Sequence, residues 1–115
     1  MVLAQIDEPT RTLEFYRPIA AGVASRIAEA EGRLEAAERY AESALQEYKE
    51  RALEPTRSGD VGEIALLLAT IKMSHNDQAA AETQLNLAIP ALTHGFGAGH
   101  SLTKSALALR DQLAK

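Results

Sequence analysis

The sequence contains no cysteine and no tryptophan, and these absences narrow the class of protein. A chain without cysteine forms no disulfides and offers no thiolate ligands, so disulfide scaffolds and zinc fingers are excluded. Aromatic residues make up only 4 % of the chain, whereas alanine is abundant. A core of alanine and leucine favours closely packed helices over a β-sandwich, because strands are enriched in aromatic and β-branched residues.

Long apolar runs and an excess of basic charge are missing as well. No segment approaches the roughly 18 consecutive apolar residues of a transmembrane helix. The opening residues 1–7 lack the basic region and the apolar stretch of a signal peptide. We therefore expect a cytoplasmic protein with no membrane partner. The formal net charge is −4, with acidic and basic residues interleaved, so we expect no nucleic-acid partner.

Apolar residues in the first half recur at steps of three and four, as one face of a helix requires. One such run begins near Thr12, where Pro18 predicts a kink or a second helix start. A second run covers residues 34–52, and Gly32 predicts a turn between the two. A single helix over residues 20–53 is the alternative, because one glycine costs a helix only about 1 kcal/mol.

Three further helices are predicted in the second half. Asp60, with Glu63 three residues later, forms a capping pair that opens the first of them. The next helix follows a polar turn at residues 74–77, and Pro90 near its end predicts a kink. Ser101 is the predicted cap of the last helix.

The two halves also repeat each other. A step of 44 residues lays Gly32 on Asn76 and matches apolar residues on both sides of the turn. The matched pairs are Ala20 with Ile64, Val23 with Leu67, Ala24 with Leu68, Ile27 with Ile71, Ala36 with Ala80, Ala37 with Ala81, Ala44 with Ala88, and Leu45 with Ile89. Such regularity indicates one helix–turn–helix unit used twice.

This pattern resembles the tetratricopeptide repeat, which places small residues at three positions where paired helices touch. Those positions fall on Ser25, Ala37, Ala44, Ala69, Ala81 and Ala88. The segment Phe96–Ser101 is similar to the opening of a kinesin-light-chain-type repeat. The resemblance implies an all-α, right-handed superhelix in one domain, residues 1–115. Repeat 1 covers about 18–53, repeat 2 about 60–93, and a closing helix about 101–114.

In this family a ligand lies in a groove lined by the first helix of each unit. Carried over by position, the groove residues are Ile19, Val23, Arg26, Glu29, Glu63, Leu66, Leu67, Thr70 and Met73. The lysines and asparagines with which some members grip a carboxylate are lacking, so the groove is expected to take an amphipathic helix or an extended segment. The alternative is that Leu66 and Leu67 fill the core or a dimer contact.

No catalytic, cofactor or metal site is predicted. His75, His94 and His100 lie in or beside loops and form no i,i+4 pair of the kind that metal sites use. Residues 95–99 are rich in glycine but lack the Gly-Lys-Ser/Thr ending of a phosphate loop, so Phe96 is expected to anchor a plain loop against the fourth helix. The glutamates Glu31, Glu35, Glu38 and Glu42 are interpreted as a solvated helix face.

The expected function is therefore that of a protein-interaction module rather than an enzyme, with a protein or peptide as partner. The alternative is a regulatory or DNA-associated helical domain inside a larger complex. Repeat arrays usually need three or more units to cover their apolar faces, so a homodimer is expected. Its candidate seams are the segment 13–16 and the last helix, through Leu102, Leu109 and Leu113.

Overall fold

The structure, a computed structural model, describes residues 22 and 24–115. Within that part all regular structure is helical, which confirms the predicted all-α class. A helical segment at residues 24–30 is followed by α2 (Leu34–Arg51), the 3₁₀ turn η2 (Pro55–Arg57), α3 (Gly59–Ser74), α4 (Gln78–Gly95) and α5 (Ser101–Leu113). The helix start near Thr12 and the kink at Pro18 lie outside the described residues. The superhelical arrangement stays a prediction.

The chain turns at Gly32, which rules out a single helix over residues 20–53. Gly32 has a φ of +80°, a conformation that glycine adopts without steric cost. The Gly32 N–H donates to Glu29 O, and the Arg33 N–H donates to Ala28 O. These two bonds define a Schellman motif, which ends the helix by satisfying its last carbonyls.

The turn between α3 and α4 has the same form. Asn76 has a φ of +59° and donates its N–H to Met73 O, and the Asp77 N–H donates to Lys72 O. Each of these residues stands 44 positions after its counterpart in the first turn. Asparagine is among the few non-glycine residues that tolerate this left-handed conformation. The two turns therefore share backbone conformation and hydrogen bonding.

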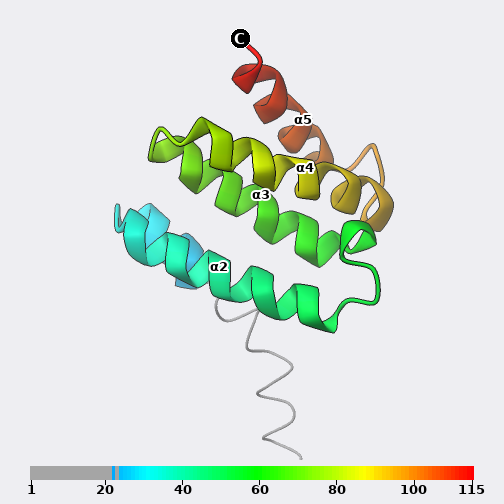
Figure 1. The fold of residues 1–115 in the computed structure, drawn as a ribbon, viewed down its shortest axis with the longest axis horizontal. Coiled ribbons are helices and arrows are strands. Elements are labelled where there is room, and N and C mark those ends of the chain that lie inside the picture. Colours follow the sequence, from blue (N-terminus) through cyan, green and yellow to red (C-terminus); the bar gives the residue numbers. More distant parts are fainter. Residues whose placement is uncertain (1–21, 23) are drawn as a thin grey trace, which may run out of the picture.

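α3 occupies the middle of the molecule, between α2 and α4, while α5 packs on the other side of α4 (Figure 1). Because α3 has helices on more than one side, it is buried over most of its surface, as a central helix must be. The small residues at the predicted helix contacts are all fully buried: Ser25, Ala37, Ala44, Ala69, Ala81 and Ala88. Their size lets the paired helices approach closely.

α3 and α4 meet most closely where the start of one passes the end of the other. A Cβ placed on Gly95 would lie 2.1 Å from the backbone N of Gly59, and one placed on Gly59 would lie 2.3 Å from the Phe96 ring. Phe96, the residue that caps the end of α4, thus packs on the start of α3 and beside His100, with ring centroids 4.8 Å apart. The predicted packing of Phe96 against the fourth helix stays a prediction.

Several predicted helix ends are wrong. The cap of α3 is Ser58, whose hydroxyl accepts from the Val61 N–H, so Asp60 lies inside the first turn. The cap of α5 is His100, and Ser101 is the first helical residue. Pro90 lies inside α4, which continues to Gly95, and the kink predicted there stays a prediction. None of the described helices combines the length and the apolar character that crossing a membrane requires.

A candidate binding groove across three helices

An open depression of about 230 Å³ lies between the helical segment 24–30, α3 and α5. It is lined by Arg26, Glu29, Glu63, Leu66, Leu67, Thr70 and Leu102. All of these except Leu102 belong to the predicted groove. Ile19 and Val23 lie outside the described residues, and Met73 is described but does not line the depression. The structure therefore brings together six predicted residues from two helices.

Buried contacts hold the segment 24–30 in place. The hydroxyl of Ser25 is fully buried and donates to Ala37 O at 2.6 Å, which ties this segment to α2. Gly22 approaches α3 so closely that a Cβ there would lie 3.1 Å from Ile64 Cδ1. These two contacts fix the rotation of the helix, so Arg26 and Glu29 face the same side as Glu63.

A second open depression of about 330 Å³ continues the first across α3. It shares Leu66 and Thr70 with the first, and its other lining residues are Ser105, Ala108, Leu109 and Gln112 of α5. The sequence interpretation missed this wall because it treated the last helix as a cover or a dimer seam and not as part of the groove. A step of 39 residues carries Leu66 onto Ser105 and Thr70 onto Leu109, so the same positional template could have found it. The two depressions together are called the groove below.

α5 owes its position to polar contacts at its start. His100 Nδ1 accepts from the Leu102 N–H at 3.1 Å, which caps the helix. The nearly buried hydroxyl of Thr103 donates to Gly97 O at 2.8 Å. The three leucines predicted as a dimer seam, Leu102, Leu109 and Leu113, pack in part against the core of the same chain. The other predicted seam, residues 13–16, lies outside the described residues.

The charges of the groove gather at one end. Arg26 and Glu63 form an ion pair between the segment 24–30 and α3, with both side chains partly exposed. A pair of this kind contributes only about 0–1 kcal/mol, so its main effect is to orient the two side chains. Glu29 has no cationic partner among the residues that the structure describes. The other end, formed by α5, is bordered by the uncharged Ser105 and Gln112.

Tyr48 lies where the end of α2 meets the start of α3, and its pKa is raised. Burial raises the pKa of its phenol, and the negative charges of Asp60 and Glu63 raise it further, while Arg26 opposes them. The same carboxylates that act on Tyr48 stand at the start of α3. The charged end of the groove itself is lined by two carboxylates, Glu29 and Glu63, and one guanidinium, Arg26, so it is acidic on balance.

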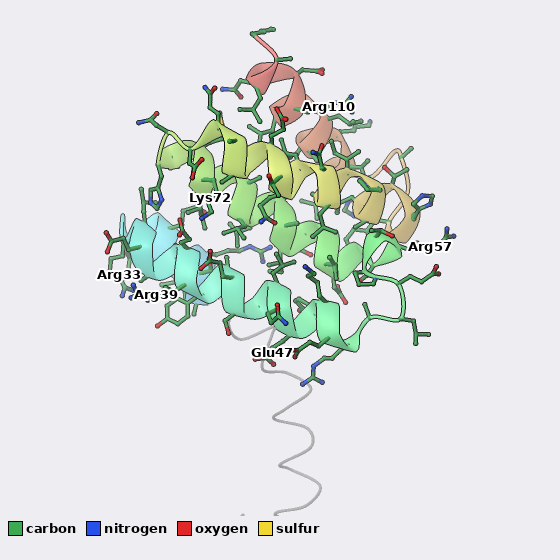
Figure 2. The ribbon with its side chains drawn as sticks, viewed as in Figure 1. Arg33, Arg39, Glu47, Arg57, Lys72 and Arg110 are labelled. Atoms are coloured by element: carbon green, nitrogen blue, oxygen red, sulfur yellow. The ribbon has the colours of Figure 1, made fainter. Side chains whose placement is uncertain are left out.

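A second polar cluster lies on the other side of α3. Lys72 (Figure 2) reaches from α3 to α2, with Nζ 3.1 Å from Glu38 and 3.7 Å from Glu42. His75 Nδ1 lies 3.0 Å from Glu38, without the alignment of a hydrogen bond. The interpretation of these glutamates as a solvated face is wrong for Glu38, because its carboxylate lies at the contact between two helices.

No family model, no curated protein and no solved structure matches this chain. The resemblance to tetratricopeptide repeats therefore rests on the residues alone.

The three histidines lie apart from the groove. His75 follows α3 beside Glu38, His94 is in the last turn of α4, and His100 caps α5. Across residues 22 and 24–115, no group of three or more histidine, aspartate and glutamate side chains is arranged to hold a metal ion. The chemistry that the groove offers is thus apolar contact with charge at one end.

Proposed function

We propose that this chain is a protein-interaction module, an adaptor or scaffold that binds a segment of a partner protein in the groove. The observation that carries the proposal is the convergence of Arg26, Glu63 and Leu67, with their neighbours, on one open and largely apolar surface. Interfaces typically combine an apolar centre with a polar rim. Binding, rather than catalysis, suits a site in which Arg26, the one cation among its described lining residues, already pairs with a carboxylate.

The proposal includes a tetratricopeptide-like repeat architecture and a cytoplasmic location. The architecture is supported by the matching turns at Gly32 and Asn76 and by the buried small residues at the helix contacts. The proposed partner is a protein or peptide and not a nucleic acid, because the net charge of −4 repels phosphates.

The test is a comparison of partners captured by the intact chain and by charge variants. Leu67→Glu and Thr70→Arg place a charge on the groove floor, and we expect both to lose the same captured proteins. Thr70 is exposed, so its replacement leaves the core intact. Leu53→Glu is the matched control, since Leu53 is fully exposed and does not line the groove. Circular dichroism checks that each variant is folded.

Direct titration then decides the matter. Each captured protein that depends on Leu67 is purified and titrated into the intact chain and into the three variants by calorimetry. We expect the groove variants to weaken binding at least tenfold and Leu53→Glu to leave it unchanged. Equal binding by all four folded chains would rule the groove out as the binding surface.

We also propose that the chain forms a homodimer, through its first unit. Ile27 is 51 % exposed, whereas Ile71, 44 residues later, is fully buried. The difference arises because α2 packs on α3, while no described helix covers the corresponding side of the segment 24–30. Sedimentation velocity of the intact chain and of Ile27→Asp tests this, and we expect a dimer that the substitution converts to monomer. A monomeric intact chain at all concentrations would exclude the dimer.

A further inference from the structure

The shape of the groove limits what its occupant must present. The two depressions are neighbours, because Leu66 and Thr70 line both of them. Each exceeds the roughly 150 Å³ of a cavity that admits a benzene-sized molecule. Leu102 of α5 lines the first depression and Leu109 of α5 lines the second. Seven residues of helix at 1.5 Å per residue span about 10 Å. A ligand that fills both depressions therefore carries two large apolar side chains about that far apart.

Helical walls offer little to the backbone of an extended peptide. The Thr70 hydroxyl on the floor already donates to Leu66 O at 3.0 Å, and Arg26 is engaged by Glu63. An extended segment would lay its N–H and C=O groups over Leu66 and Leu67 without partners, and unpaired polar groups on an apolar surface are unfavourable. A helix satisfies its own backbone. Its side chains at i and i+7 are about 10 Å apart on one face, which matches the spacing of the depressions.

The charges at the groove rim add a requirement on the charge of the ligand, after its apolar spacing and its helical conformation. Glu29 lines the first depression and has no cationic partner among the described residues. Glu63, which lines the same depression, is paired with Arg26. The second depression has only neutral polar residues at its rim. A positive side chain on the ligand gains attraction at the first depression and none at the second, so charge also sets the direction in which the ligand lies.

We infer that the groove takes an amphipathic helix of a partner protein, with apolar anchors seven residues apart and a lysine or arginine beside the anchor that meets Glu29. This inference rests on the proposed function. It adds the conformation, the anchor spacing and the charge of the ligand.

The experiment is a selection from a displayed library of random 18-residue peptides, with the intact chain as bait. We expect the enriched peptides to carry large apolar residues at i, i+3 or i+4, and i+7, together with at least one lysine or arginine. Synthetic copies are then titrated by fluorescence anisotropy, and their helicity is followed by circular dichroism. We expect helicity to rise on binding. Leu67→Glu is expected to weaken binding at least tenfold and Leu53→Glu to leave it unchanged.

Charge reversal tests the direction. With Glu29→Lys as bait we expect basic peptides to bind about fivefold more weakly and versions with glutamate in place of lysine to bind more tightly. Peptides that depend on Leu67 but lack helical spacing, or that ignore Glu29→Lys, would overturn this inference and leave the proposed function standing. An absence of enrichment, or binders unaffected by Leu67→Glu, would overturn both.

Discussion

The contact between Gly59 and Gly95 yields the sharpest test of the packing. In Gly95→Ala, the added methyl would lie 2.1 Å from the backbone N of Gly59 and 2.5 Å from its Cα. Real Cβ atoms do not come that close to backbone atoms, and no side-chain rotation relieves the overlap. The start of α3 must therefore move away from the end of α4.

The cost follows from general magnitudes. Inserting a methyl group into a closely packed contact costs about 1–3 kcal/mol, and a backbone-to-backbone contact places Gly95→Ala at the upper end. Alanine gains up to about 1 kcal/mol over glycine in a helix, and less at the last helical residue. We expect a net loss of about 2 kcal/mol. Unfolding entropy near 2.1 cal/mol/K per residue gives about 0.24 kcal/mol/K for this chain, so Tm falls by about 8 °C.

Thermal unfolding followed by circular dichroism, with urea unfolding in parallel, measures the loss. Gly99→Ala is the matched control, because no atom lies within 4 Å of its added Cβ, and we expect it to change stability by less than about 0.5 kcal/mol. Adding Phe96→Ala should not restore Gly95→Ala, since the overlap is with backbone and not with the ring. A Gly95→Ala protein as stable as the unchanged chain would refute the close approach.

Three further predictions concern other parts of the molecule. Gly32→Ala should lower the unfolding free energy by about 1 kcal/mol, because alanine resists a φ of +80°, while Asn76→Gly should be neutral in the same urea titration. The Lys72 side chain is 16 % exposed. Burial lowers its pKa, but the hydrogen bond and charge of Glu38, together with the charges of Glu42 and Asp77, outweigh burial, so the pKa is raised. The folded state thus holds this proton more tightly than the unfolded chain, and the stabilisation is present below the ordinary lysine pKa of about 10.4 and lost as the pH rises through the folded-state value. Lys72→Met should therefore cost about 1–2 kcal/mol at pH 7 and progressively less above pH of about 10.5, and a gap that stays constant with pH would contradict the assignment. Thr103→Val removes a buried hydrogen bond to the loop before α5, and we expect a loss of about 1 kcal/mol with faster amide exchange confined to α5.

The turns were the most predictable part of the fold. A glycine and an asparagine 44 residues apart are two residue types that share a tolerance for positive φ, and both stand at the same point of a Schellman motif. Apolar spacing and the step of 44 residues converge on these turns independently. The apolar spacing and the repeat step thus place the turns at the same residues.

Helix ends were less predictable because several capping residues compete within a few positions. Ser58 and Asp60 both carry oxygens that can cap α3, and only the path of the chain out of η2 places the Ser58 hydroxyl at the Val61 N–H. Pro90 lies inside α4, five residues before its last residue. Ala91 and Leu92, which follow it, are buried, and tertiary contacts commonly override local propensity.

The groove was half predictable. Positions carried over from the repeat pattern found the walls contributed by the segment 24–30 and by α3. They missed α5, because the groove positions were carried over to the first two units only and not to the last helix. The repeat pattern placed Arg26 and Glu63 in the same groove, but it did not predict that they form an ion pair.

The sequence left open whether Leu66 and Leu67 on α3 fill the core or line a binding groove. Both interpretations apply, and to different degrees in these neighbouring residues. Leu66 is only 9 % exposed, yet it lines both depressions, so its side chain supports the core with one side and the groove floor with the other. Leu67 and Thr70 are more exposed and line the groove with less of their surface committed to the core. Substitution of Leu66 must therefore change stability and binding together. Changes at Thr70 can alter binding alone, which is why the groove is best probed there.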